Sequence, residues 1–453
     1  YRPYLLRSTD RGRTWTSLSA DLGERDLVWA LEQDHVDPEL LFLGAEFGLY
    51  FSLDGGGHWQ RVAGSPHLAF RDLEIQRREN DLVAASFGRG FYVLDDYTPL
   101  RAIDQAALDA PATLFPVRDT LWFVPELELQ NRDEGSKGSD YWSAENPPYG
   151  ALLTYHLSSP PRGASAQRRE REQALDPQAD VPLPDLETLR AERSEPAVRH
   201  LITVRDDSGE VVRRLEVPGE AGFHRVAWDL RLPDYEPVRL ETPGALPPWY
   251  SPPVGPLVPP GRYTARLSRV SRGQEVALGE ERSFELKPIF EPAVEPADPS
   301  EILTFQRRTG ALYQKASGAA LELARAGERL DHLEAAIVQG PGVALELLES
   351  VHSLHAAVAR LEIDLVGDDL LRSLQEPSRP SILGRLGTVI GGHWSSRQGP
   401  TRTHRESFAV AEAAYAAIEP TIRSLLEDEL PELERAAAEQ GARWTPGRRL
   451  DGR

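Results

Sequence analysis

Few side chains in this sequence could carry chemistry, and the strongest candidates lie in the first hundred residues. Glu46 could act as a catalytic carboxyl group, and Arg89 could bind the carboxylate of a substrate. Hydrolysis of a glycosidic bond needs two carboxyl groups across that bond, one of them with a raised pKa. The sequence identifies no second carboxyl group to pair with Glu46, so the catalytic residues stay unassigned.

The motifs of several other enzyme classes are absent. The sequence contains no Gly-x-Ser-x-Gly, no His-Glu-x-x-His, no phosphate-binding loop and no dinucleotide fingerprint. It contains no Cys, which excludes disulfides, thiol nucleophiles and Cys-ligated zinc. His352, His355 and Glu362 invite a metal interpretation, but no matching Glu-x-x-His pair stands on another predicted helix. We therefore predict no metal site and no cofactor.

Composition excludes further classes. The formal net charge is −20, which argues against nucleic acid as a partner, because such proteins present a basic field. Hydrophobic residues make up 40% and charged residues 27%, as in globular proteins, and no apolar run is long enough to span a membrane. The length of 453 residues favours about three domains.

An internal repeat opens the chain. Residues 8–15 and 52–59 both read Ser-x-Asp-x-Gly-x-x-Trp, 44 residues apart, which is the period of a four-stranded propeller blade. The Asp is expected to accept backbone N–H bonds in a tight turn, the Gly to take a positive φ, and the Trp to fill the space between blades. We predict structural roles for these repeat positions: Ser8, Asp10, Gly12, Trp15, Ser52, Asp54, Gly56 and Trp59.

The repeat resembles the Asp-box, or BNR, repeat of sialidases, some glycoside hydrolases and the sortilin/Vps10 propellers. Residues 86–100, 146–151, 222–231 and 259–263 extend the resemblance to large bacterial BNR/sortilin-like proteins of the "glycosyl hydrolase" type, over nearly the whole chain. Phe87 stands where that family has His in Thr-His-Gly-Arg-Gly, which puts a role of this position in doubt.

The resemblance implies a ligand face on the loops between strands two and three of a blade and between successive blades. The residues of this chain on those loops are predicted to bind ligand: Glu46, Phe47, His67, Arg71 and Arg89. The resemblance also implies a secreted or periplasmic protein.

Three domains are predicted: residues 1–112 as the last blades of a propeller, residues 113–296 as an Ig/fibronectin-like β-sandwich, and residues 297–453 as an antiparallel helical bundle. A charged insertion near 160–198 is expected to be a solvated loop, because it is rich in Arg, Glu, Pro and Ala. The aromatic stretch from 121–125 to 140–142 is expected to pack domains together, with ligand stacking as the alternative. Helices are predicted over 298–339, 343–365, 381–389 and 403–439, with Pro420 and Pro431 kinking or breaking the last.

The repeat count predicts an incomplete ring. Two and a half blades cannot close a propeller, so the other blades are expected upstream or in a companion chain. The absence of Met, with Tyr1 as the first residue, indicates a fragment or processed product, unless modified methionines are missing from the sequence.

Two functions remain open. The first is recognition of a glycan or peptide ligand by the propeller face, with the sandwich and bundle as accessory or docking domains and a homo-oligomer as an alternative assembly. The second is a glycoside hydrolase of the BNR type, with catalytic carboxylates mostly in the missing blades. The lack of a carboxylate pair favours recognition.

Overall fold

A computed structural model describes the chain except for residues 1, 20, 126–143, 145, 160–162, 176–182, 239, 241–251, 291–296, 395 and 449–453. The Cα positions divide it into two compact units. Unit 1 comprises Tyr1–Leu121, Trp142–Asp229 and Gly261–Lys287, and unit 2 comprises Trp122–Tyr141, Leu230–Pro260 and Pro288–Arg453. The division into three domains remains a prediction.

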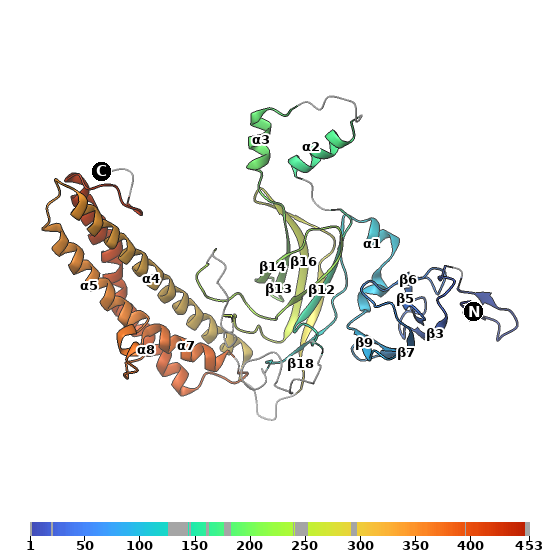
Figure 1. Cartoon of the computed structure of the whole chain (residues 1–453). Coiled ribbons are helices and arrows are strands. Elements are labelled where there is room, and N and C mark those ends of the chain that lie inside the picture. The colour runs from blue at the N-terminus through green and yellow to red at the C-terminus, as the bar shows by residue number, and fades with distance from the viewer. Residues whose placement is uncertain are drawn as a thin grey trace. The chain divides into compact units, whose positions relative to one another are not determined.

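Unit 1 begins with three antiparallel sheets in which sequence neighbours pair, drawn in blue in Figure 1. The first holds β1 (Leu6–Arg7) and β2 (Thr16–Ser17). The second holds β3 (Val28–Gln33), β4 (Leu41–Ala45), β5 (Gly48–Ser52) and β6 (Gln60–Arg61). The third holds β7 (Phe70–Gln76), β8 (Asp81–Ser86) and β9 (Phe91–Leu94).

The second and third sheets repeat the same pairing. In β3 the register shifts between Val28 and Ala30, so Trp29 is the extra residue of a β-bulge. In β7 the register shifts between Phe70 and Asp72, which makes Arg71 the extra residue. The two bulged residues stand 42 positions apart, the same offset as between the first residue of β5 and Gly90 before β9. The repeat seen in the sequence is therefore also a repeat in backbone geometry.

These two sheets pack on each other through a shared apolar core. The second sheet, with the connection between β3 and β4, contributes Leu40, Phe42 and Leu49. The third contributes Phe70, Leu73, Ile75, Leu82 and Ala84. The backbones come close at Gly44, where an added Cβ would lie only 2.7 Å from the carbonyl oxygen of Phe70. A side chain at this position would push the sheets apart.

A buried carboxylate joins the end of β3 to the segment that follows β9. The Asp34 side chain is fully buried and accepts two hydrogen bonds of 2.8 Å from the Arg101 guanidinium. It also accepts hydrogen bonds from the Tyr97 hydroxyl at 2.6 Å and the Asp37 amide at 2.7 Å, while Arg101 donates to the Asn80 side chain. Burial raises the pKa of the Asp34 carboxyl, but these hydrogen bonds outweigh it and hold the pKa well below its ordinary value.

The remainder of unit 1 forms two larger antiparallel sheets. A short 3-10 turn, η1 (Thr98–Ala102), and helix α1 (Gln105–Asp109) lead into them. One sheet has the order β10 (Ala112–Leu114), β12 (Ala151–Leu157), β15 (Gly222–Trp228). The other has the order β11 (Thr120–Trp122), β18 (Arg282–Pro288), β16 (Gly261–Ser271), β13 (Arg199–Asp206), β14 (Val211–Val217), with β17 (Gln274–Ala277) paired to β16.

Trp228 fills the space between these two sheets. Its side chain is fully buried, and its ring lies 5.5 Å from that of Tyr263 and 6.3 Å from that of Phe284. Trp228 belongs to the smaller sheet and the other two rings to the larger one, so the sheets share one core. The identification of this pair of sheets as Ig-like remains a prediction.

The charged insertion contains two helices where a solvated loop was expected. These are α2 (Ala164–Gln173) and α3 (Leu186–Arg193), and neither has a buried residue. Arg168 joins them through two hydrogen bonds to Glu192, at 2.7 and 2.9 Å, and also binds Glu172. Ala, Arg and Glu are strong helix formers, and this propensity outweighs the lack of an apolar stripe.

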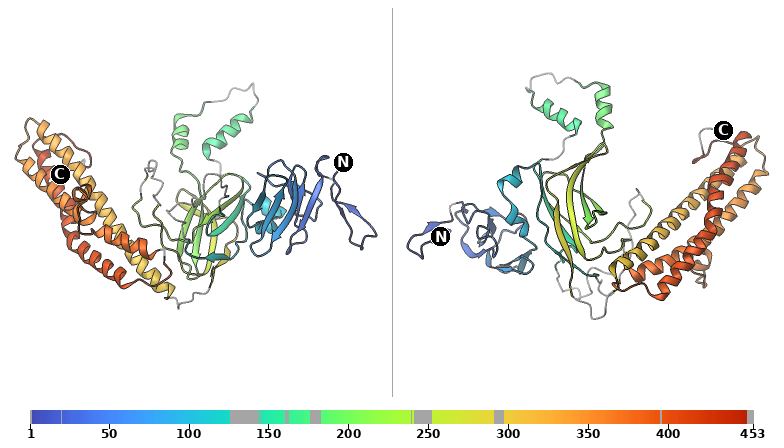
Figure 2. Two further views of the ribbon diagram at one scale, coloured as in Figure 1. Left: turned by 60° about the horizontal axis from the view of Figure 1, so that its bottom comes forward. Right: turned by 180° about the vertical axis from the view of Figure 1, so that it is seen from behind.

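Unit 2 carries a bundle of helices, whose ribbons run side by side in gold to red in Figure 2. They are α4 (Pro299–Gln339), α5 (Leu347–Leu365), α6 (Asp369–Ser373), α7 (Ile382–His393), α8 (Arg402–Ser424), the π-helical turn η2 (Leu425–Glu429) and α9 (Leu430–Glu439). No helix of the described residues is long and apolar enough to cross a bilayer.

The two prolines near the C-terminus act differently. Pro420 lies inside α8, so it does not break this helix, and a kink there remains a prediction. Pro431 stands in the first turn of α9, directly after the π-helical turn. Proline has no N–H to donate to the preceding turn, and this locally wider turn is where the regular α-helical pattern is interrupted.

The buried ion pair at Asp34 yields a prediction for stability. Asp34→Asn removes the counter-charge of the partly buried Arg101 guanidinium and should lower the free energy of unfolding by about 3 kcal/mol, the lower end of the range for a broken buried pair. Urea denaturation at neutral pH measures this loss. Asp207→Asn, in the exposed turn between β13 and β14, is the matched control and should change stability little. Equal stability of the two variants would contradict the role given to Asp34.

Candidate functional site

One edge of the second and third sheets gathers the candidate residues. The β4–β5 turn meets the start of β3, where the Glu46 amide donates to the Leu27 carbonyl at 2.9 Å. The β8–β9 turn meets the start of β7 in the same way, through the Phe87 amide and the Ala69 carbonyl, also at 2.9 Å. In each sheet, a backbone hydrogen bond thus joins the turn between two strands to the residue that precedes the first strand.

Four side chains at this edge form what we call the face cluster: Trp29, Glu46, Arg71 and Phe87. The Trp29 indole N–H donates to Glu46 Oε2 at 2.7 Å. The Arg71 guanidinium carbon lies 3.5 Å from the centre of the Trp29 ring and 5.0 Å from that of Phe87. A guanidinium nitrogen of Arg71 is 3.8 Å from the same Glu46 oxygen. The cluster therefore combines a cation–π stack with an ion pair and a charge-assisted hydrogen bond.

The paired β-bulges place the two central residues of this cluster. A bulge adds one residue to a strand and re-aims its side chain, and such bulges are enriched beside functional sites. Trp29 and Arg71 are the extra residues of equivalent bulges in neighbouring sheets. Their contact therefore depends on both bulges and on the packing of the two sheets.

The cluster presents aromatic surface to solvent. Phe87 is 71% exposed and Trp29 43% exposed. Phe47, which neighbours Glu46 in the same turn, is 37% exposed, and the Arg25 guanidinium lies 5.2 Å from its ring centre. Exposed rings next to a carboxylate and guanidinium groups can stack on a flat ligand and exchange hydrogen bonds with it.

The structure brings together some of the predicted ligand residues and separates others. Glu46 and Arg71 contact each other, and Phe47 lies beside them. His67 and Arg89 are exposed, and within the described part of the chain neither makes a hydrogen bond or ion pair to the cluster. Trp29 was missed, because it stands in a short apolar strand. Its offset of 42 residues from Arg71 is the signal that could have identified it.

The Ser-x-Asp-x-Gly-x-x-Trp turns lie at the opposite end of β5 from the face cluster. Asp54 Oδ1 accepts hydrogen bonds from the Ser52 hydroxyl and the His58 amide, both at 2.8 Å, and the Gly56 amide donates to Ser52 Oγ at 2.9 Å. Gly56 has a φ of +90°, a conformation that favours glycine. These hydrogen bonds are internal to the turn, and the turn lies away from the candidate site.

The first copy repeats these bonds 44 residues earlier. Asp10 Oδ1 accepts from the Ser8 hydroxyl at 3.0 Å and from the Thr14 amide at 2.8 Å, and the Gly12 amide donates to Ser8 Oγ at 2.7 Å. Trp15, however, is 60% exposed. Trp59 in the second copy is 8% exposed, and its indole N–H donates to the Leu18 carbonyl at 2.7 Å.

Two ionisable groups of the second turn stabilise each other. His58 Nδ1 lies 2.6 Å from Asp54 Oδ2. Burial raises the pKa of Asp54, but the hydrogen bonds from His58 and Ser52 outweigh it and lower the pKa to about 2. The hydrogen bond to Asp54 raises the pKa of His58 above its ordinary value. This pair is most stable at pH values where Asp54 is ionised and His58 is protonated.

The described residues give no support for a metal site. Among the described residues, no group of three or more acidic or histidine side chains could hold a metal ion. His352 and His355 each lie near one carboxylate of α4, Glu334 at 3.7 Å and Asp331 at 3.2 Å. The predicted aromatic stretch at 140–142 lies outside the described residues.

Comparisons with known proteins add no family. No family model and no curated protein matches the sequence. Among solved structures, the extracellular domain of the hybrid two-component system BT4673 from B. thetaiotaomicron has a TM-score of 0.18 at 10% identity, covering 64% of this chain. PorZ, a surface component of the type-IX secretion system of Porphyromonas gingivalis, has a TM-score of 0.14 at 12% identity, covering 58% of this chain. This chain spans 29% and 30% of those two chains, and TM-scores at this level carry no argument about fold or function.

The repeated turns yield a second prediction. Asp54→Ala leaves the His58 amide and the Ser52 hydroxyl without their acceptor and should lower the free energy of unfolding by about 1–2 kcal/mol. Asp10→Ala is the matched control and should cost less, because the ring of Trp15 in that copy is already exposed. Thermal or urea unfolding of both variants measures the difference.

The pH dependence follows from the two pKa shifts. The depressed pKa of Asp54 makes its contribution present above its ordinary value of 3.8 and lost as pH falls through about 2. The raised pKa of His58 makes its contribution present below its ordinary value of 6.5 and lost as pH rises through the folded value. The stability difference between the protein and Asp54→Ala should therefore be largest between about pH 4 and 6.5. A difference independent of pH would contradict the Asp54–His58 interaction.

Proposed function

We propose that the chain is part of a recognition protein that binds a glycan through the face cluster. The contact between Arg71, Trp29 and Glu46 carries this proposal. It holds the indole and guanidinium in a fixed arrangement before any ligand arrives, and such preorganisation lowers the entropic cost of binding. The exposed rings can stack on the apolar face of a sugar, and the charged groups can hydrogen-bond its hydroxyls.

Hydrolysis of a glycan is the less favoured function. Within the described residues, Glu46 is the one carboxylate of the face cluster, and it contacts the Trp29 indole and the Arg71 guanidinium. A glycosidase requires a second carboxyl group across the bond that breaks. A hydrolase would need that group from blades outside this chain.

We propose further that these sheets belong to a propeller and that other sheets complete its ring. The four strands β3–β6 form one blade, β7–β9 form three strands of the next, and β1–β2 form the last two strands of a preceding one. Sheet faces at both ends are open in the described residues: Leu6 is 50% exposed at one, and Phe91 and Val93 are 73% and 54% exposed at the other. Upstream blades or a companion chain would cover them, and an association of copies is the alternative.

The other proposed assignments rest on the family resemblance. Residues 113–296 and 297–453 serve as an Ig-like sandwich and a helical bundle with accessory or docking roles. The protein is secreted or periplasmic, where a glycan or peptide ligand is accessible.

A glycan array with three variants tests the proposal. The protein should bind a restricted set of immobilised glycans without releasing reducing ends. Trp29→Ala and Arg71→Ala should weaken binding to that set at least tenfold, because each removes half of the stacked pair. Arg77→Ala is the matched control, since Arg77 directly follows the end of β7 that is farther from the cluster, and its binding should be unchanged.

The array has outcomes that would overturn the proposal. If the protein bound peptides but none of the glycans, the ligand would be a peptide. Release of reducing ends would support a hydrolase. Equal binding by the protein, Trp29→Ala and Arg71→Ala would remove the face cluster from the site.

A further inference from the structure

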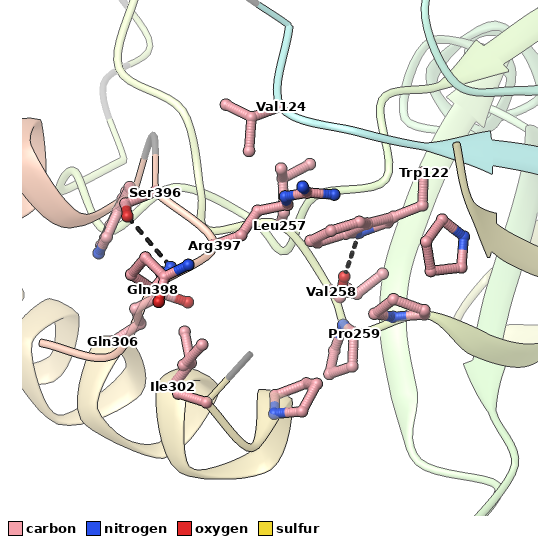
Figure 3. A pocket seen from close by; sticks show the side chains of 15 residues that line it. Trp122, Val124, Leu257, Val258, Pro259, Ile302, Gln306, Ser396, Arg397 and Gln398 are labelled. Atoms are coloured by element: carbon pink, nitrogen blue, oxygen red, sulfur yellow. Dashed lines mark hydrogen bonds between the residues drawn. The ribbon is translucent and has the colours of Figure 1, made fainter. Parts of the chain in front are cut away.

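Unit 2 contains a cavity of about 160 Å³ that is separate from the face cluster. Five parts of the chain line it: the end of β11 with the residues that follow it, the proline-rich segment before β16, Pro288 at the end of β18, the start of α4, and the loop after α7. Figure 3 shows Trp122 and Leu257 facing Ile302 across this space, with Arg397 reaching in beside the Trp122 ring.

The walls of the cavity are apolar and stiff. Four prolines line the cavity, and the ring of each fixes its backbone φ angle: Pro259, Pro260, Pro288 and Pro299. Trp122 is held in place by a hydrogen bond from its indole N–H to the Val258 carbonyl at 2.7 Å. Stiff walls keep the cavity open when it is empty, so it is suited to a ligand.

Polar side chains also line the cavity, and two of them, Gln306 and Ser396, are hydrogen-bonded within the described residues. Trp394 is 7% exposed, and its indole nitrogen has no hydrogen-bond partner among the described residues. Arg397 makes ring contacts, with its guanidinium carbon 4.6 Å from the centre of Phe290 and 5.9 Å from that of Trp122. In the described part of the chain no carboxylate lies within ion-pair distance of Arg397.

The Arg397 guanidinium and the volume of the cavity define the ligand that would fit. Stacking uses the face of a guanidinium and leaves its N–H edge free to bind a carboxylate. The volume is close to that of a cavity of about 150 Å³ that holds one benzene ring. An unpaired cation beside a ring-sized apolar space is complementary to a small molecule with one ring and one negative charge.

We propose that this cavity binds a small aromatic carboxylate, with the ring between Trp122 and Ile302 and the carboxylate on Arg397. The site is independent of the proposed glycan recognition. No covalent step is involved, so the cavity would serve for binding alone.

Ligand titration of the full chain tests this inference. Phenylacetate is the probe, and benzyl alcohol and benzylamine are probes with the same ring and a neutral or positive group. Isothermal calorimetry or saturation-transfer NMR should show phenylacetate binding at least tenfold tighter than benzylamine. Arg397→Gln should weaken phenylacetate binding at least tenfold and abolish its advantage over benzyl alcohol.

Two further variants complete the design. Arg423→Gln, an exposed arginine on α8, is the matched control and should bind phenylacetate as the unmodified protein does. Ile302→Trp should fill the cavity and abolish binding of all three probes while circular dichroism shows an unchanged fold. No binding of phenylacetate at millimolar concentration, equal binding of benzylamine, or unchanged binding by Arg397→Gln would each overturn the proposal.

Discussion

The candidate site depends on the packing of two small sheets, and the buried Asp34 carboxylate secures that packing. Asp34 directly follows β3, whereas Tyr97 and Arg101 follow β9, so one ion pair links the two sheets across more than sixty residues of chain. A buried carboxylate without these donors would be costly, because the charge has left water. The shared core fixes the distance between the sheets, and this interaction ties their far ends together. Trp29 and Arg71 can stack only while that spacing is kept.

The sequence alone could predict much of the candidate site but not its central contact. Glu46, Phe47 and Arg71 follow from the repeat and from the loops that the resemblance implies. Trp29 could not be recognised from its type, since a tryptophan in a short apolar strand is usually a core residue. The bulge that turns it outward is a property of strand pairing, and single-residue shifts in register are weakly encoded in local sequence. His67 and Arg89 lie on the predicted ligand loops, but in the described part of the chain they make no hydrogen bond or ion pair to the face cluster.

The fold divides in a similar way. Repeated turn motifs and helical stripes are local patterns, so the Ser52–Asp54 turn and the start of α4 at Pro299 agree with expectation. The helices α2 and α3 were missed because no apolar face marks them, and propensity with the Arg168–Glu192 pair stabilises them. The cavity at Trp122 and Arg397 joins residues some 275 positions apart in the chain. No short-range pattern predicts such a meeting.

A crystal structure of the chain with the glycan that binds it most tightly would test the central claim most directly. The account predicts a sugar ring against Trp29 or Phe87, with its hydroxyls within hydrogen-bond distance of Glu46 and Arg71. A glycan bound elsewhere on the chain, with the face cluster unoccupied, would contradict it.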